Sequence, residues 1–279
     1  MYRLLSGLLI VSLIVFSCKE GQNRESGKQE ITIPEFQYFQ SFDNTQIAFI
    51  DEGDGTSVML LHGFINDATN WSRSALKGQL LANGYRVIIP DLRGNGRSDH
   101  LHTDEGYQDF AQTRDLIALA DHLEINNYIV VGYSRGSIIL GKLLTMDNRI
   151  TKAVIGGMGI SFTDPNWDVP MRFAKAFVGE EPLSDMTEGA VNYAKSINAD
   201  LLALSLQQRY QPSTSLTDLN NLDIPLLILA GDEDDSNGIS QELGNAMPKA
   251  KFKLVPGDHN NTYKSEAFGE AVLEFMEME

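Results

Sequence analysis

The chain has 279 residues, of which 42% are hydrophobic, and this is enough to bury a core on both sides of a sheet. It carries 38 acidic and 22 basic side chains, giving a formal net charge of −16. Because phosphate backbones are bound by clustered lysines and arginines, this balance excludes nucleic acid as a partner.

Residues 1–17 have the pattern of an export signal. Arg3 is followed by an apolar run from Leu4 to Phe16, which is short for a membrane-spanning helix of roughly 20 residues. The run ends in a serine followed by Cys18, which resembles the bacterial lipobox, whose cysteine becomes the lipidated first residue of the mature protein. We therefore expect lipidation at Cys18, the only cysteine of the chain. The alternatives are a plain secretory signal with an incidental cysteine and an uncleaved anchor.

Residues 18–30 are polar and are expected to form a flexible tether between the lipid anchor and a folded domain over 31–279. A single cysteine allows no intramolecular disulfide. These features predict an exported lipoprotein, anchored to a membrane of the bacterial cell envelope. They leave the membrane face and the oligomeric state open.

From residue 31 onward, strand and helix patterns alternate. The expected strands are residues 36–40, 45–50, 57–61, 86–89, 128–131, 153–157, 225–230 and 251–255. The expected helices are residues 70–82, 107–123, 137–144 and 265–276. Apolar strands that alternate with helices predict an α/β fold with a mostly parallel sheet covered on both faces. The segment 161–223 has no strand pattern but has aromatic residues among helix formers, so we expect a helical cap there.

The most informative motif is Gly132-Tyr133-Ser134-Arg135-Gly136, which lies between an apolar strand and a helix pattern. Gly-x-Ser-x-Gly in this context predicts a nucleophile elbow, in which a strained serine is lifted off the sheet edge beside the free N–H groups of a helix.

Three further motifs follow predicted strands and therefore belong to the same sheet edge. Leu61-His62-Gly63-Phe64 places a backbone N–H of Phe64 where it can point at an oxyanion, with His62 as a structural residue below it. The segment 91–98, with Asp91 and Arg93, is expected to be a tight structural turn. Gly257-Asp258-His259 places His259 on a loop after the last strand.

Together these motifs, in chain order, resemble the α/β-hydrolase superfamily, and specifically its serine hydrolases. The resemblance covers nearly all of residues 36–279 and implies a Ser…Asp…His triad whose acid follows the penultimate strand. Its Gly-x-x-Asp spacing selects Asp234, with Asp232 and Asp235 as rivals. The implied roles are Ser134 as nucleophile, His259 as base and Asp234 as its orienting acid. The backbone N–H groups of Phe64 and Arg135 would form the oxyanion hole.

The resemblance predicts a carboxylesterase acting on a small-molecule substrate without a cofactor or metal. The alternatives are cleavage of a C–C bond, an amide, a lactone or a peptide by the same triad, or a ligand-binding or signalling protein of this fold. A serine at position 134 argues against epoxide hydrolases and dehalogenases, which use a carboxylate nucleophile. Arg135 is unusual directly after the nucleophile, because a cation opposes the helix dipole there. Its side chain is expected to pair with an acid or to meet an anionic substrate.

Overall fold

The computed structural model describes residues 35–278. Cys18, the expected signal sequence and the expected tether lie outside these residues, so those features stay predictions. Within the described part of the chain, no helix is both long and apolar enough to cross a membrane.

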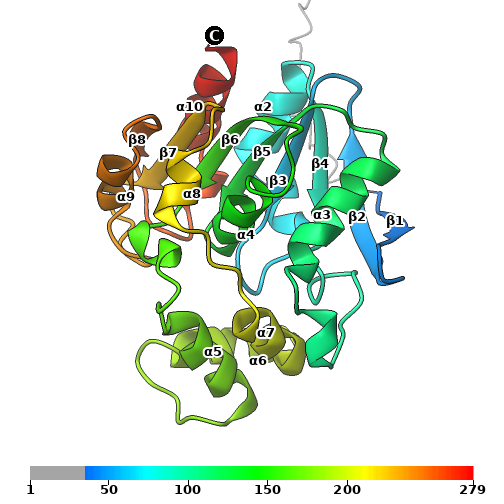
Figure 1. Cartoon of the computed structure of the whole chain (residues 1–279), viewed down its shortest axis with the longest axis vertical. Helices are drawn as coiled ribbons and strands as arrows, with labels where there is room; N and C mark the ends of the chain where they lie inside the picture. The colour runs from blue at the N-terminus through cyan, green and yellow to red at the C-terminus, as the bar shows by residue number, and fades with distance from the viewer. Residues whose placement is uncertain (1–34, 279) are drawn as a thin grey trace, which may run out of the picture. The chain divides into compact units, whose positions relative to one another are not determined.

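An eight-stranded sheet forms the centre of the fold (Figure 1). Across the sheet the strands are β1 (Gln37–Gln40), β2 (Gln46–Glu52), β4 (Arg86–Pro90), β3 (Ser57–Leu61), β5 (Tyr128–Tyr133), β6 (Ile150–Gly156), β7 (Leu226–Gly231) and β8 (Lys251–Val255). β1 pairs antiparallel with β2, and β2 with β4, whereas all the other neighbours are parallel. The predicted mostly parallel sheet is confirmed.

Helices cover both faces of the sheet, which is why its central strands are continuous apolar runs. Ile129 and Val131 of β5 pack with α1 (Ala68–Ser72), α2 (Ala75–Ala82) and α10 (Glu266–Glu277). Val130, which points to the other face, packs with α3 (Ala111–His122), α4 (Arg135–Leu143), α8 (Leu216–Asn220) and α9 (Ser240–Ala246).

Two expected helices differ from the prediction. The helix expected over 70–82 is divided, because Ser74 has extended backbone and its hydroxyl donates to the Trp71 carbonyl at 2.8 Å, between α1 and α2. The helix expected over 107–123 begins only at residue 111. Asp109 and Phe110 before it have φ of 51° and 58°, which a right-handed helix does not contain. A short 3₁₀ helix, η1 (Asp104–Gly106), precedes them.

Between β6 and β7 the described chain forms helices and no strands. These are η2 (Ile160–Thr163), α5 (Val169–Val178), α6 (Glu188–Ser196), α7 (Leu201–Arg209) and α8. Helices α5, α6 and α7 share a small apolar core that also includes Ile65, and they lie beyond one edge of the sheet (Figure 1). The structure thus has a helical cap late in the chain, as expected from the sequence.

Candidate active site

Ser134 lies at the sharp turn between β5 and α4, with φ 53° and ψ −125°, a conformation that L-residues rarely adopt. The turn needs glycine on both sides. A Cβ on Gly132 would lie 2.7 Å from the Gly136 carbonyl oxygen, and one on Gly136 would collide with the Leu61 carbonyl. The spacing of the motif therefore follows from backbone crowding, and the turn has the strained geometry of a nucleophile elbow.

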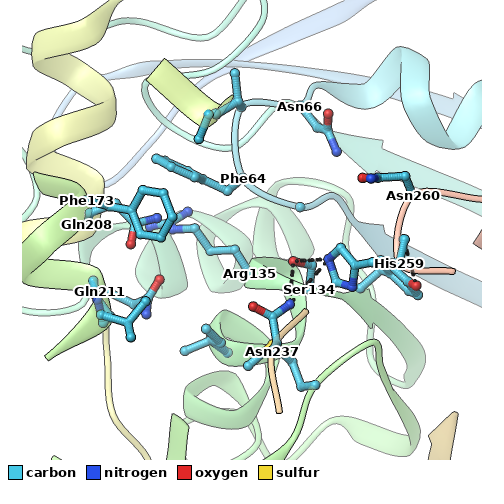
Figure 2. A pocket seen from close by; sticks show the side chains of 18 of the residues that line it. Phe64, Asn66, Ser134, Arg135, Phe173, Gln208, Gln211, Asn237, His259 and Asn260 are labelled. Carbon is cyan, nitrogen blue, oxygen red and sulfur yellow. Dashed lines mark hydrogen bonds between the residues drawn. The ribbon is translucent and has the colours of Figure 1, made fainter. Parts of the chain in front are cut away.

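His259 reaches Ser134 from the loop after β8. Its Nε2 lies 3.0 Å from the Ser134 Oγ (Figure 2). Its Nδ1 lies 2.9 and 3.0 Å from the two carboxylate oxygens of Asp234. A carboxylate only accepts hydrogen bonds, so Nδ1 carries the proton and donates. Nε2 is therefore free to accept the serine proton, which is the tautomer that a general base needs.

The structure separates Asp234 from its two rivals. The Asp234 side chain is 2% exposed and faces the imidazole, whereas Asp232 and Asp235 are exposed. Asp232 instead accepts a hydrogen bond from the Gly257 N–H at 3.0 Å, which ties down the loop that carries His259. Only Asp234 is in contact with the histidine.

Asn237, which no sequence motif marked, also contacts Ser134 and His259. Its Nδ2 lies 3.4 Å from Ser134 Oγ and 3.3 Å from His259 Nε2, and it donates to the Gly157 carbonyl at 3.2 Å. Because a carbonyl oxygen only accepts, this last bond directs the amide nitrogen toward the pair (Figure 2). A single asparagine in a loop has no spacing pattern that a sequence could reveal.

Two backbone donors lie next to Ser134. A Cβ on Gly63 would be 3.3 Å from the Ser134 Cβ, so the segment that carries Phe64 passes directly beside the serine. Arg135 is the first residue of α4, where helical N–H groups lack partners. Neither the Phe64 nor the Arg135 N–H donates to another described group. The chain thus leaves two free donors where an oxyanion hole would lie.

His62 supports this segment from below. Its Nε2 accepts from the Leu92 N–H at 3.0 Å, so its Nδ1 donates to the Gly63 carbonyl at 2.9 Å. Burial lowers the pKa of His62 to about 4, which keeps the ring neutral at pH 7. His62 therefore joins the Gly63 turn to the end of β4, in agreement with the structural role expected for it.

Asp91 and Arg93 also have structural contacts. Asp91 accepts from the Ala68 and Arg97 N–H groups at 2.6 and 2.7 Å, and burial raises its pKa to about 6. The fully buried Arg93 forms ion pairs of 2.7 Å with both Asp43 and Asp115. Neither Asp91 nor Arg93 lines the cavity described next.

Ser134 and His259 open into a cavity of about 600 Å³. Phe64 contributes to its wall and packs edge-to-face on Phe173 and Phe177 of α5, at ring-centroid distances of 6.1 and 5.4 Å. The cap helices α5, α6 and α7 supply the lining residues Val169, Pro170, Phe173, Gly189, Ala190, Tyr193 and Gln208. Within residues 35–278, no group of three or more His, Cys, Asp or Glu side chains could hold a metal ion.

Comparisons with known proteins agree with the fold described above. A family model described as the alpha/beta hydrolase fold matches residues 56–178. A non-heme haloperoxidase of Rhodococcus erythropolis is 26% identical over 271 residues, spanning 84% of this chain and 97% of that protein. An epoxide hydrolase of Caballeronia sordidicola is 34% identical over 38% of this chain and 32% of its own length. A 2-hydroxy-6-oxo-6-phenylhexa-2,4-dienoate hydrolase of Burkholderia cepacia is 33% identical over 45% of this chain and 46% of its own length.

Solved structures show the same architecture. A bromoperoxidase from Bacillus anthracis superposes with a TM-score of 0.71 at 23% identity, covering 88% of this chain and 100% of that one. An esterase from Exiguobacterium antarcticum has a TM-score of 0.69 at 20% identity, covering 87% and 99%. This chain has the α/β-hydrolase fold. Relatives that match it are named as enzymes, which supports a hydrolase activity for this protein.

Proposed function

We propose that this protein is a serine hydrolase that cleaves carboxylic esters of small or medium size, using Ser134, His259 and Asp234 as its catalytic triad. The observation that carries the proposal is the 3.0 Å contact between His259 Nε2 and Ser134 Oγ at a strained strand-to-helix turn. A cavity of about 600 Å³ is within the usual range for small-molecule sites.

In the first step, Ser134 Oγ attacks the ester carbonyl carbon while its proton passes to His259 Nε2. The imidazolium that forms is stabilised by Asp234, which holds the Nδ1 proton. The negative charge that develops on the carbonyl oxygen is stabilised by the backbone N–H groups of Phe64 and Arg135. When the tetrahedral intermediate collapses, His259 returns the proton to the departing alcohol, leaving an acyl group on Ser134.

In the second step, water replaces the alcohol. His259 removes a proton from a water molecule, which attacks the acyl carbonyl, and the same two N–H groups stabilise the second oxyanion. Collapse releases the carboxylic acid, and the proton held by His259 returns to Ser134 Oγ. No group beyond these residues and water is needed for this reaction to balance.

The names of the relatives cover several reactions, so the fold alone does not select one. The chemistry of Ser134 does favour a carbonyl substrate. If a serine oxygen opened an epoxide, the product would be an ether, which has no carbonyl carbon for water to attack. The enzyme would then be trapped, whereas an acyl-serine is readily hydrolysed.

Cleavage of a C–C bond next to a carbonyl is the second candidate. It would use the same acyl-enzyme chemistry, and the match to the dienoate hydrolase of Burkholderia cepacia favours it. A substrate panel distinguishes the candidates: p-nitrophenyl acetate, butyrate and octanoate, a matched anilide, a lactone and a vinylogous diketone. We expect the butyrate ester to be turned over fastest, with no turnover by Ser134→Ala. Faster cleavage of the diketone than of all the esters would contradict the esterase assignment.

We further propose that Cys18 is lipidated and anchors the mature protein in the bacterial cell envelope. The support is the position of the only cysteine, directly after an apolar segment and a serine. Expression in a bacterial host, followed by membrane fractionation and mass spectrometry of the N-terminal peptide, tests this. The Cys18→Ser variant should lose the lipid mass and leave the membrane fraction. Retention of Cys18→Ser in membranes would contradict the proposal.

A further inference from the structure

Arg135 holds a buried positive charge that no described side chain neutralises. It is 3% exposed, and its Nη2 donates to two neutral acceptors, the Gln112 side chain at 2.5 Å and the Gln207 carbonyl at 3.0 Å. A guanidinium has five N–H donors. The three remaining N–H groups, one on Nε and two on Nη1, have no acceptor among residues 35–278, and the Nε atom is fully buried.

Other arginines of the protein show how unusual this is. Arg93, which is equally buried, forms ion pairs with two aspartates. Arg86 and Arg149, which are less buried, each have an aspartate at 2.6 or 2.7 Å. Burial lowers the pKa of Arg135 to about 9, so it still carries its charge at pH 7. The sequence suggested that the Arg135 side chain either pairs with an acidic residue or meets an anionic substrate. Pairing with an acidic residue is wrong for the described part of the chain.

The cavity beside Arg135 has the opposite charge character to the rest of the chain. The protein contains 38 acidic residues, yet no Asp or Glu is among the residues that line the cavity. Arg135 and the exposed Lys264 are its cationic lining residues. Arg135 links Gln112 of α3 to Gln207 of α7, but an uncharged donor could make the same link. Burying a charge for that purpose alone would cost free energy. The charge is therefore explained by a ligand that supplies the missing anion.

The direction of the Arg135 side chain tells where that anion would lie. In Figure 2, the side chain of Arg135 extends from Ser134 toward Gln208 and Phe173, whereas His259 lies on the other side of the serine. The leaving alcohol must be near His259, because His259 protonates it. The acyl part of the substrate therefore extends toward Arg135.

We propose, on the basis of the serine-hydrolase function above, that the substrate is an ester whose acyl group carries a carboxylate, bound by Arg135. One carboxylate matches the single buried positive charge, whereas a phosphate dianion would leave a net charge in the cavity. Gln208 and Gln211, which line the same part of the cavity, add amide donors and acceptors near this position. Such a protein cleaves half-esters of dicarboxylic acids in preference to neutral esters.

The test compares two esters of the same shape. Mono-p-nitrophenyl glutarate has a terminal carboxylate, and p-nitrophenyl 5-methylhexanoate has an isopropyl group in its place. We expect the ratio of their kcat/KM values, charged over neutral, to fall about 10- to 100-fold in Arg135→Met, the usual range for a lost hydrogen bond to a charged group. Since both esters use the same Ser134 chemistry, any effect of the variant on the oxyanion hole or on folding cancels in the ratio. An unchanged ratio would overturn the proposal.

Lys264→Met is the matched control, because it removes the other cation from the cavity lining. We expect it to leave the ratio unchanged. A fall as large as that of Arg135→Met would place the anion at Lys264 and overturn the proposal. Arg135→Lys, which keeps the charge, should retain a ratio above that of Arg135→Met.

A binding measurement separates this proposal from the hydrolase function itself. Monomethyl glutarate is titrated calorimetrically into Ser134→Ala, which cannot cleave it, and into Ser134→Ala/Arg135→Met. We expect at least about tenfold weaker binding to the double variant. If folded wild-type protein cleaved neither ester but this difference persisted, the hydrolase function would fail and the carboxylate site would stand. Equal binding to both variants would overturn the site, and tighter binding of methyl 4-phosphonobutanoate would overturn the choice of a carboxylate.

Discussion

The Tyr133 hydroxyl donates a hydrogen bond to the backbone carbonyl of His259 at 2.9 Å. Tyr133 directly precedes Ser134 at the end of β5, and His259 lies on the loop after β8. This bond therefore fixes the loop that carries the base to the strand that carries the nucleophile. The two rings also pack at a centroid distance of 5.3 Å, so the imidazole is positioned by Tyr133 as well as by Asp234.

Tyr133→Phe should lower kcat about 2- to 10-fold with little change in KM, because it removes the hydroxyl that donates to the His259 carbonyl and also lies 3.4 Å from Asp234 Oδ2. Tyr128→Phe is a matched control on the same strand. Tyr128 begins β5, at the opposite end of the strand from Ser134, and its hydroxyl donates to Asp147 at 2.9 Å. We expect Tyr128→Phe to lower the melting temperature without lowering kcat, as measured by thermal denaturation and ester kinetics. Equal losses of kcat in the two variants would contradict the positioning role of Tyr133.

Asp234→Asn should reduce kcat by about 10⁴, because an amide can donate to Nδ1 and would favour the wrong imidazole tautomer. Asp232→Asn serves as its control. Asp232 accepts from a backbone N–H and does not contact His259, so we expect a loss of less than about tenfold. Steady-state kinetics on one ester measures both. If Asp232→Asn or Asp235→Asn were the more damaging change, Asp234 would not be the triad acid.

Asn237→Asp should be much more damaging than Asn237→Ala. The amide nitrogen lies 3.4 Å from Ser134 Oγ, so a carboxylate of the same shape would compete with His259 for the hydroxyl proton and would repel the oxyanion that forms on the attacked carbonyl beside the serine. We expect a loss in kcat/KM of about 2- to 10-fold for Asn237→Ala and at least about 100-fold for Asn237→Asp. Asn260→Asp, which also lines the cavity, should cost less. Similar losses for Asn237→Asp and Asn260→Asp would rule out a direct effect at Ser134.

His62 should make the stability of the protein depend on pH. An unfolded histidine binds a proton near pH 6.5, but buried His62 does so only near pH 4. The unfolded state therefore binds more protons between these values, and the free energy of unfolding falls as the pH drops from 7 to 5, by about 2 kcal/mol from this group.

Urea denaturation of wild type and His62→Gln at pH 7 and pH 5 measures this contribution. His62→Gln should be less stable at pH 7 but lose less stability on acidification. Asp91 acts in the opposite sense, since its pKa is raised to about 6 and the folded state takes up its proton first as the pH falls. Its contribution is common to both proteins and cancels in the comparison. Equal losses in wild type and His62→Gln would contradict a neutral, buried His62.

Much of the fold could be predicted because its causes are local. Strands buried on both faces are continuous apolar runs, and the turn at Ser134 requires glycines at positions 132 and 136, so both leave a pattern in the sequence. The division of the helix at Ser74 left no such pattern, because serine also occurs in the interior of helices and does not by itself mark a break. The choice of Asp234 among three aspartates needed the family spacing, since only the folded loop shows which one faces His259.

Contacts between distant segments could not be predicted in the same way. Asn237 meets Ser134 across 103 residues of sequence, and nothing near either residue indicates this. The sequence did mark Arg135 as unusual, but left open whether an acid or a ligand would balance its charge. That choice depends on Gln112 and Gln207, which are brought to Arg135 by α3 and α7.

The proposed reaction requires that Ser134 is an activated nucleophile. Treatment of the full-length protein with a fluorophosphonate, followed by intact-mass measurement, tests it most directly, with Ser134→Ala treated in parallel. We predict a single covalent adduct on wild type, none on Ser134→Ala, and slow labelling of His259→Ala. Folded wild-type protein without an adduct, or an adduct that persists on Ser134→Ala, would contradict the claim and favour a ligand-binding role for this fold.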